Sequence, residues 1–167
     1  MGCRVVAALS ALAFAVSCLA GEGKQAAVFT IGKPDGLAAE FGLAKSGWHN
    51  YLKAFPGPVV YTVGKSKATD WPYLHPSNND RWAGGRPHTF TIRFLLVEPP
   101  RGKMFLVVGA ADAHPNEPSV ITFSVNGATF ATRKAPRGTG RAVRDTSLWV
   151  RPWAIVVAIP EGALHTG

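Results

Sequence analysis

Hydrophobic and polar residues alternate along several short stretches of this chain. In residues 88–97 (HTFTIRFLLV), Phe90, Ile92 and Phe94 fall on one side, and polar residues fall on the other. This period of two is typical of a strand with one buried face. Residues 120–125 (VITFSV) alternate in the same way. Both stretches are therefore predicted to be β-strands.

Further strands are predicted where apolar and β-branched residues form short runs between turn residues. These runs are 26–31 (AAVFTI), 59–63 (VVYTV), 103–111 (KMFLVVGAA), 128–132 and 153–159 (WAIVVAI). Asn126 and Gly127 predict a type I′ hairpin turn, because both residues tolerate a positive φ. Residues 35–44 are expected to form either one short helix or a loop. The expected fold class is all-β, an antiparallel jelly-roll β-sandwich.

The N-terminal segment has a different pattern. A mostly apolar run extends from Val5 to Val16, Arg4 precedes it, and a polar segment begins at Gly21. The run is too short for a membrane span and is typical of a signal peptide. We therefore expect residues 1–20 to be a removed signal peptide and residues 26–167 to form one domain that is extracellular or periplasmic.

Both cysteines of the chain, Cys3 and Cys18, lie in this segment. Ala15-Val16-Ser17-Cys18 resembles a weak lipobox, so a lipoprotein anchored through Cys18 is the alternative to ordinary cleavage, which is favoured. With ordinary cleavage the domain is expected to contain no cysteine, and therefore no disulfide and no zinc site built from cysteines.

The composition is that of a folded, basic domain. Hydrophobic residues make up 47% of the chain, and 18 Lys and Arg against 10 Asp and Glu give a net charge of +8. Without Arg4, 17 basic residues against 10 acidic residues leave a net charge of +7. A positive field favours an anionic partner. Nucleic acid, a membrane surface and an acidic polysaccharide are the candidate partners, and export makes nucleic acid the least expected of the three.

Several unusual motifs follow one another along the chain. They are residues 30–36 (TIGKPDG), 61–66 (YTVGKS), 70–73 (DWPY) and 125–127 (VNG). In this order they resemble the third, carbohydrate-binding-module-like domain of rhamnogalacturonan lyases, polysaccharide lyase family 4. The resemblance begins at about Phe29 and extends to the C-terminus. It implies a jelly-roll sandwich that binds rhamnogalacturonan or a similar pectin-type polysaccharide.

The resemblance also implies that this chain is not an enzyme. The eliminating Lys and His of the family lie in a separate N-terminal domain, which has no counterpart here, so no catalytic residue and no cofactor are expected. A separate catalytic domain is a candidate partner. Family members continue to one more strand, whereas this chain ends at Gly167. Either the chain is truncated, or the sandwich lacks its last strand, which would leave an open edge.

Two alternative functions follow from these expectations. The chain could be a fragment of a polysaccharide lyase, or it could be a structural module that packs against a partner domain.

Three aromatic residues of the long loop 66–86 are candidates for sugar binding, because flat rings pack against the C–H faces of pyranoses. Trp71, which precedes a proline, is expected to favour a core position. Tyr73 and Trp82 have polar neighbours and are the better contact candidates.

Basic residues supply candidate partners for a uronate carboxylate, which arginine can bind with two hydrogen bonds. Arg137 and Arg141 lie in a basic run between two predicted strands, and the alternative is a solvated loop. Lys65 would extend a basic surface if these loops meet at one end of the sandwich.

Other chemistries find little support. The five histidines show no metal-ligand spacing, and Asp70, Asp80 and Asp112 lack the regular spacing of a calcium loop. Val59 stands where a phosphate-binding loop ending at Gly64-Lys65-Ser66 needs its first glycine. No metal site is therefore predicted, and a structural calcium ion has no support.

Overall fold

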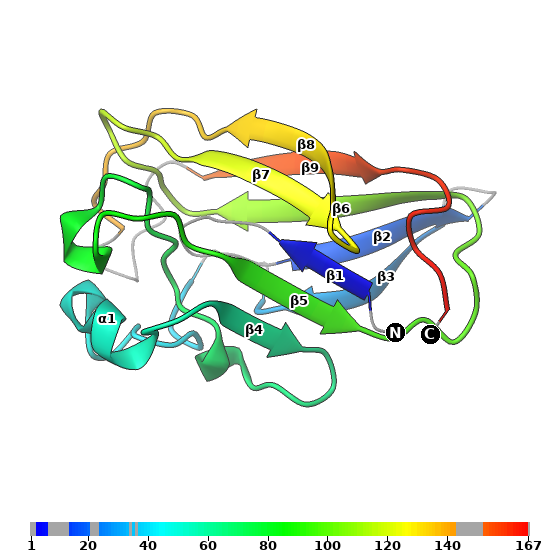
Figure 1. Ribbon diagram of the computed structural model, residues 1–167, viewed down its shortest axis with the longest axis horizontal. Helices are drawn as coiled ribbons and strands as arrows, with labels where there is room; N and C mark the ends of the chain where they lie inside the picture. The colour runs from blue at the N-terminus through cyan, green and yellow to red at the C-terminus, as the bar shows by residue number, and fades with distance from the viewer. Residues whose placement is uncertain are drawn as a thin grey trace.

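Two β-sheets, one behind the other in Figure 1, contain the strands of the described residues. The computed structural model describes residues 3–6, 14–20, 24–33, 35, 37–142 and 152–166, and of residues 3–6, 14–20 and 24–26 it describes the backbone alone. The front sheet has the order β4 (Val59–Thr62), β5 (Phe90–Phe94), β1 (Cys3–Val6), β7 (Val120–Val125) and β8 (Ala128–Lys134). The back sheet has the order β3 (Lys24–Ile31), β2 (Phe14–Ala20), β6 (Lys103–Ala110) and β9 (Trp153–Ile159). The all-β prediction is confirmed.

The predicted hairpin is present between β7 and β8. Asn126 and Gly127 have φ values of 50° and 88°, as a type I′ turn requires. The two strands pair antiparallel, with Val125 opposite Ala128, and their register shifts between Phe123 and Ser124. This bulge increases the local twist of the hairpin.

One strand pair departs from the expected antiparallel arrangement. β4 runs parallel to β5, with Val59 opposite Phe90. The two strands are joined through the long loop 63–89, and a connection of that length allows the chain to return in the same direction. The expectation of a wholly antiparallel sheet was therefore wrong for this pair.

In the part of the chain that the structure describes, helical structure is confined to single turns in the connections. They are η1 (Trp48–Asn50), α1 (Tyr51–Ala54), η2 (Ala68–Asp70) and η3 (Arg81–Ala83). The described part of residues 35–44 forms turns, so the loop alternative holds there and the helical one was wrong. None of the helices among the described residues has the length and apolar character to span a membrane.

Part of the predicted signal peptide lies within the sheets. β1 lies between β5 and β7, and β2 lies between β3 and β6, all paired antiparallel. The structure is that of the unprocessed chain, so removal of residues 1–20 stays a prediction. In this chain, however, each sheet has one inner strand from that segment.

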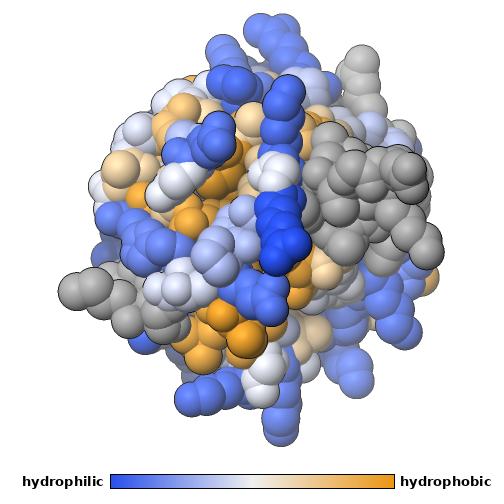
Figure 2. Space-filling model, turned by 90° about the vertical axis from the view of Figure 1, so that its right-hand side faces the viewer, coloured by the Kyte–Doolittle hydropathy of each residue, from blue (hydrophilic) through white to orange (hydrophobic). Residues whose placement is uncertain are grey.

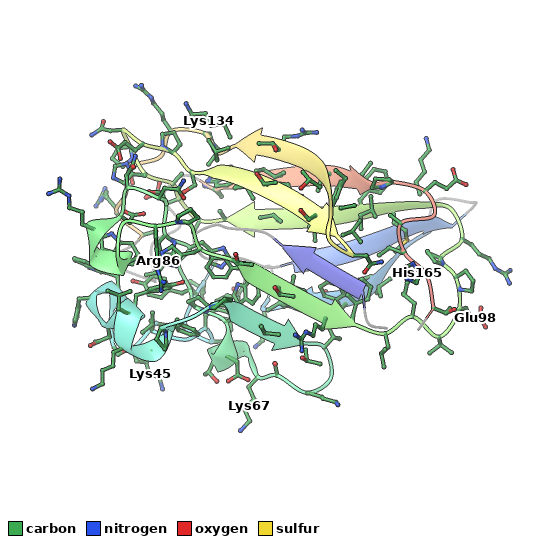
Figure 3. The ribbon with its side chains drawn as sticks, viewed as in Figure 1. Lys45, Lys67, Arg86, Glu98, Lys134 and His165 are labelled. Atoms are coloured by element: carbon green, nitrogen blue, oxygen red, sulfur yellow. The ribbon has the colours of Figure 1, made fainter. Side chains whose placement is uncertain are left out.

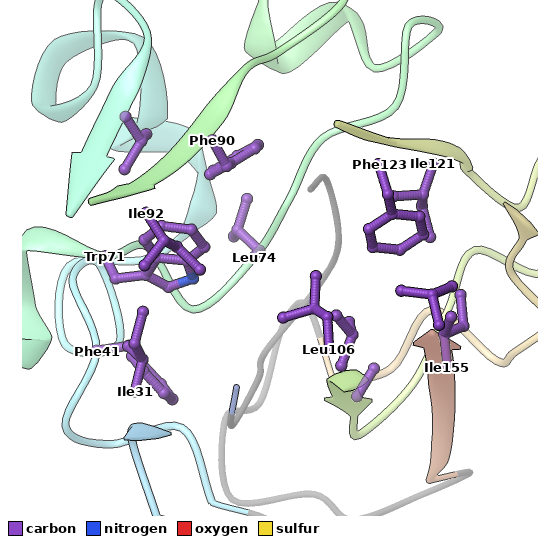
Figure 4. Close-up of a cluster of buried hydrophobic side chains, with 14 of the residues drawn as sticks. Ile31, Phe41, Trp71, Leu74, Phe90, Ile92, Leu106, Ile121, Phe123 and Ile155 are labelled. Carbon is purple, nitrogen blue, oxygen red and sulfur yellow. The ribbon is translucent and has the colours of Figure 1, made fainter. Parts of the chain in front are cut away.

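The alternating residues of the strands build one core between the sheets. Side chains of the front sheet, such as Ile92 and Phe123, and of the back sheet, such as Leu106 and Ile155, belong to one buried cluster (Figure 4). Phe123 is fully buried, and burying a phenylalanine contributes about 1.5–3 kcal/mol. The faces that β5 and β7 bury are therefore the ones that their alternation predicts.

Candidate functional site

A groove of about 600 Å³ lies at the end of the two sheets where the loops gather, on the left in Figure 1. We call it the end groove. Four segments form it, and their lining residues are Trp48; Leu74, His75, Asn79, Asp80, Arg81 and Trp82; Ala113, His114, Pro115 and Ser119; and Ala135, Thr139, Gly140 and Arg141. Its volume is in the range of about 300–1,000 Å³ that is typical of ligand sites.

Aromatic rings form one wall of the end groove. Trp82 packs edge-on against Trp48, with ring centroids 5.5 Å apart, and against Tyr51 at 5.8 Å. The Nε1–H of Trp82 donates a hydrogen bond of 2.9 Å to Oδ1 of Asp80. The other oxygen of Asp80 accepts a hydrogen bond from the backbone N–H of Ser77. The indole of Trp82 is therefore held in one orientation while remaining partly exposed.

The loop of the opposite wall is organised by Asp112, which is 2% exposed. Its Oδ1 accepts hydrogen bonds from the backbone N–H groups of Ala113 (2.8 Å) and Thr139 (2.7 Å). Its Oδ2 accepts from the hydroxyl of Thr139 (2.7 Å) and from the backbone N–H groups of Arg141 (2.8 Å) and Ala142 (3.3 Å). One carboxylate thus fixes the backbone of residues 139–142.

Two features show how closely this loop is held. Burial acts to raise the pKa of Asp112, but the hydrogen bonds from Thr139, Ala113 and Ala142 outweigh it, and the pKa lies below its ordinary value. A Cβ atom on Gly138 would overlap the backbone of Ala113 and the carboxylate of Asp112. The loop therefore needs both the ionised carboxylate and a glycine.

The end groove has two arginines. Arg81 and Arg141 are both exposed, and among the described residues neither side chain has an ion pair or a hydrogen bond. Guanidinium groups bind carboxylates, and the hydroxyl and amide groups of Thr139, Ser119 and Asn79 can bind ligand hydroxyls. The arrangement suits a ligand with a flat apolar face, several hydroxyl groups and negative charge.

His75 forms part of the groove floor but is a core residue. It is 3% exposed, its ring stacks on Phe90 with centroids 3.9 Å apart, and Trp71 packs against it at 5.3 Å. Burial, together with the nearby His88, holds the pKa of His75 well below its ordinary value. It is therefore neutral at neutral pH. No group of three His, Cys, Asp or Glu side chains among the described residues could hold a metal ion.

The structure places the three candidate aromatic residues differently. Trp71 is fully buried, in agreement with the favoured core position (Figure 4). The expectation that Tyr73 presents its ring to solvent was wrong, because Tyr73 is 2% exposed. Burial raises the pKa of Tyr73 to about 12, while a hydrogen bond with the backbone of Trp48 acts in the opposite direction. Only Trp82 of the three lines the end groove.

The basic candidates do not share one surface. Arg141 lines the end groove, whereas Arg137 and Lys65 are exposed outside its lining. Lys67, close to Lys65 in sequence, and Lys134 lie on opposite edges of the molecule in Figure 3. Lys65 is not among the lining residues of the groove, so its share in a basic surface there stays a prediction. Arg144, also part of the basic run, lies outside the described residues.

Sequence reasoning missed three residues of this site. Trp48 lies within the range of the family resemblance but outside the aromatic loop 66–86. Nothing in the neighbouring sequence indicated that its ring contacts Trp82. Arg81 is adjacent to Trp82, which was a signal that the same loop carries both a ring and a cation. Asp112 follows a strand and precedes a loop, but its partners are 27–30 residues further along the chain.

Comparison with known families supports the motif-based resemblance. Residues 27–167 match a family model described as the CBM-like domain III of polysaccharide lyase family 4. Comparisons with curated proteins and with solved structures give no match. The matched range contains all four segments of the end groove. Because it covers most of the sequence, this chain belongs to the CBM-like domain III family of polysaccharide lyase family 4.

Proposed function

We propose that this chain is a non-catalytic carbohydrate-binding domain whose end groove binds acidic polysaccharide of the pectin type, such as rhamnogalacturonan. Membership in a CBM-like family supports carbohydrate binding. The net charge of +8 supports an acidic ligand, because a positive field raises the local concentration of polyanions.

The combination of rings and arginines in one groove carries this proposal. Trp82 and Trp48 offer apolar ring surface, and Arg81 and Arg141 offer guanidinium groups in the same groove. A uronic acid unit has both complementary parts, an apolar C–H face and a carboxylate.

Two arginines of one loop allow a matched test. We expect Arg141→Ala to lower the affinity for polygalacturonate or rhamnogalacturonan about tenfold, or about 1.4 kcal/mol, because it removes a charge-assisted hydrogen bond. Arg137→Ala removes the same charge outside the groove and should change the affinity by less than about twofold. Affinity electrophoresis and calorimetry at two salt concentrations measure both, and binding should weaken with salt.

Two results would contradict the proposal. Equal losses in the two variants would show that net charge, and not the groove, holds the polymer. Ultraviolet absorbance from new unsaturated uronate ends, produced by the purified chain, would show that it is a lyase.

We also propose a jelly-roll sandwich and an exported protein. The two facing sheets and the family membership support the jelly-roll topology. The apolar run from Val5 to Val16 supports export, with lipid anchoring through Cys18 as the alternative.

An observation at the opposite end favours a second role, packing against a partner domain. The connection between β5 and β6 lies there, and in it Leu95 is 72% and Val97 is 95% exposed. Figure 2 shows this end, with hydrophobic side chains among the hydrophilic ones. Exposed apolar groups of this kind suit contact with a catalytic domain of the same family. Cross-linking or co-purification with such a domain, lost in Val97→Lys, tests this role.

A further inference from the structure

Two histidines lie behind the aromatic wall of the end groove, which Trp48 and Trp82 form. The ring of His88 packs edge-on against Tyr51, with ring centroids 5.3 Å apart. Tyr51 in turn packs against Trp82 at 5.8 Å. The other histidine, His75, lies in the groove floor and is 3% exposed. A change in the charge of either histidine therefore acts directly beneath the surface that is proposed to bind the polymer.

His88 is half-buried among groups that disfavour its charged form. Its Nδ1 lies 3.5 Å from the hydroxyl oxygen of Tyr51, and its Nε2 is buried with no hydrogen-bond partner among the described residues. A charged ring carries a proton on both nitrogens, so the Nε2–H would be buried without an acceptor. Burial and the positive charge of Arg86 lower the pKa of His88, and the backbone of Ala83 and the charge of Asp80 counteract this only in part.

His75 is enclosed more completely than His88. Its ring stacks on Phe90 and contacts the indole of Trp71, two neighbours that offer no negative charge. Burial holds the pKa of His75 well below its ordinary value, and the nearby His88 adds to this effect. Charging one of the two histidines therefore makes it harder to charge the other while the loop keeps its closed packing.

The other ionisable groups of the groove lining give the histidines little compensation. Asp80 is the one carboxylate among the described lining residues, and its oxygens already accept hydrogen bonds from Trp82 and Ser77. The remaining ionisable groups of that lining are Arg81, His114 and Arg141. Glu117 borders the same hollow as His88, but its side chain is exposed, so water screens its charge.

Proton uptake by the histidines therefore favours an open form of the wall. In an open form both rings reach water, and the pKa of each returns to about 6.5. In the closed form the pKa of each is lower. The closed form is thus fully favoured above about pH 6.5 and loses this advantage as the pH falls towards the closed-form pKa of each histidine. Within that range each histidine shifts the balance up to about tenfold per pH unit.

We propose that His75 and His88 form an acid-sensitive switch beneath the end groove, and that acidification opens the aromatic wall and releases the bound polymer. The inference adds regulation to the proposed function of the groove and rests on it. Opening separates Tyr51 from Trp82, which removes the packing that orients this indole. The sheets need not unfold, because both histidines lie in the connection between β4 and β5.

Binding at two pH values tests the switch. In calorimetry at constant salt, we expect the full chain to bind rhamnogalacturonan oligosaccharides or polygalacturonate at least about tenfold more weakly at about pH 4.5 than at about pH 7.5. The carboxylates of these ligands remain largely ionised at the lower value. Combining His75→Phe with His88→Phe keeps both rings but removes both titrating groups. This double variant should bind with affinities that differ by less than about twofold between the two pH values.

His165→Phe is the matched control, because His165 is exposed and lies at the opposite end of the molecule from Arg86, a neighbour of His88 (Figure 3). It should keep the full pH dependence. The NMR signal of the Trp82 indole N–H provides a second measurement on the unaltered chain, which decides the matter if the double variant does not fold. This signal should shift on acidification, since the hydrogen bond to Asp80 is disturbed, while far-ultraviolet circular dichroism stays unchanged.

Three results would overturn the switch and leave the end-groove proposal intact. They are equal affinity at the two pH values, a loss at acidic pH that the double variant retains, and a loss that appears only together with the circular dichroism signal of the sheets. Absence of binding to either ligand at both pH values would refute the proposed function itself, and the switch with it.

Discussion

At the scale of single residues, Asp112 has the largest structural role in the candidate site. It does not line the end groove itself, but its two oxygens accept four hydrogen bonds from the loop that carries Arg141 and one from the backbone N–H of Ala113. A buried carboxylate is tolerated only when such donors replace its lost hydration. The position of the arginine is therefore set by the aspartate.

Asp112→Asn tests this role. The amide NH₂ of the new asparagine would face backbone N–H groups, so hydrogen-bond donors would point at each other in a buried site. We expect the free energy of unfolding to fall by about 3 kcal/mol, measured by chemical denaturation, with weaker glycan binding through the displaced Arg141. Asp70→Asn is the control, because the carboxylate of Asp70 is exposed and accepts a backbone hydrogen bond of 2.9 Å from Lys67, so this change should cost less than about 1 kcal/mol.

The same carboxylate gives a prediction for pH. The pKa of Asp112 in the folded state lies below the ordinary value of 3.8. The ionised carboxylate therefore stabilises the fold fully above the unfolded-state pKa, and this stabilisation is lost as the pH falls through the folded-state pKa. The stability difference between the unaltered chain and Asp112→Asn should therefore be constant near neutrality and shrink below about pH 4. A difference that does not change with acid would show that the charge of Asp112 does not matter.

Gly138 tests the close approach in the same loop. In Gly138→Ala the added methyl group overlaps the backbone of Ala113, which cannot move as a flexible side chain can. We expect a loss of about 2 kcal/mol or more and weaker binding in the end groove. Gly57→Ala places its methyl group in open space, so thermal unfolding should show little change. Similar behaviour of the two variants would mean that the loop is free to shift.

At the scale of the elements, sequence patterns predicted the strands better than the site. The alternation in β5 and β7 identified their buried residues, such as Phe90 and Phe123, because burial on one face requires a period of two. Tyr73 was misjudged because polar neighbours in sequence do not determine burial in a loop. The backbone of residues 71–76 turns inward, and all six of these residues are buried.

The end groove could be predicted only in part for a related reason. Its lining comes from segments around residues 48, 80, 114 and 140, which contact one another only after the sheets have formed. Trp82 and Arg141 were identified by their chemistry alone, whereas Trp48 required the ring contact that the fold creates. Residue type was therefore the basis of the proposed ligand class, whereas only the topology shows which residues lie together.

At the scale of the whole molecule, the proposed export and the observed sheets make opposite demands on residues 1–20. Their removal would delete β1, which pairs with β5 and β7, and β2, which pairs with β3 and β6. These four strands would each lose the partner on one edge. Unpaired strand sides lower stability and promote association. We therefore expect residues 21–167 alone to unfold at a lower temperature than the full chain and to associate, as calorimetry and light scattering would show. The prediction fails if the shortened chain is monomeric and equally stable, because the sheets would then close without β1 and β2, as a cleaved signal peptide requires.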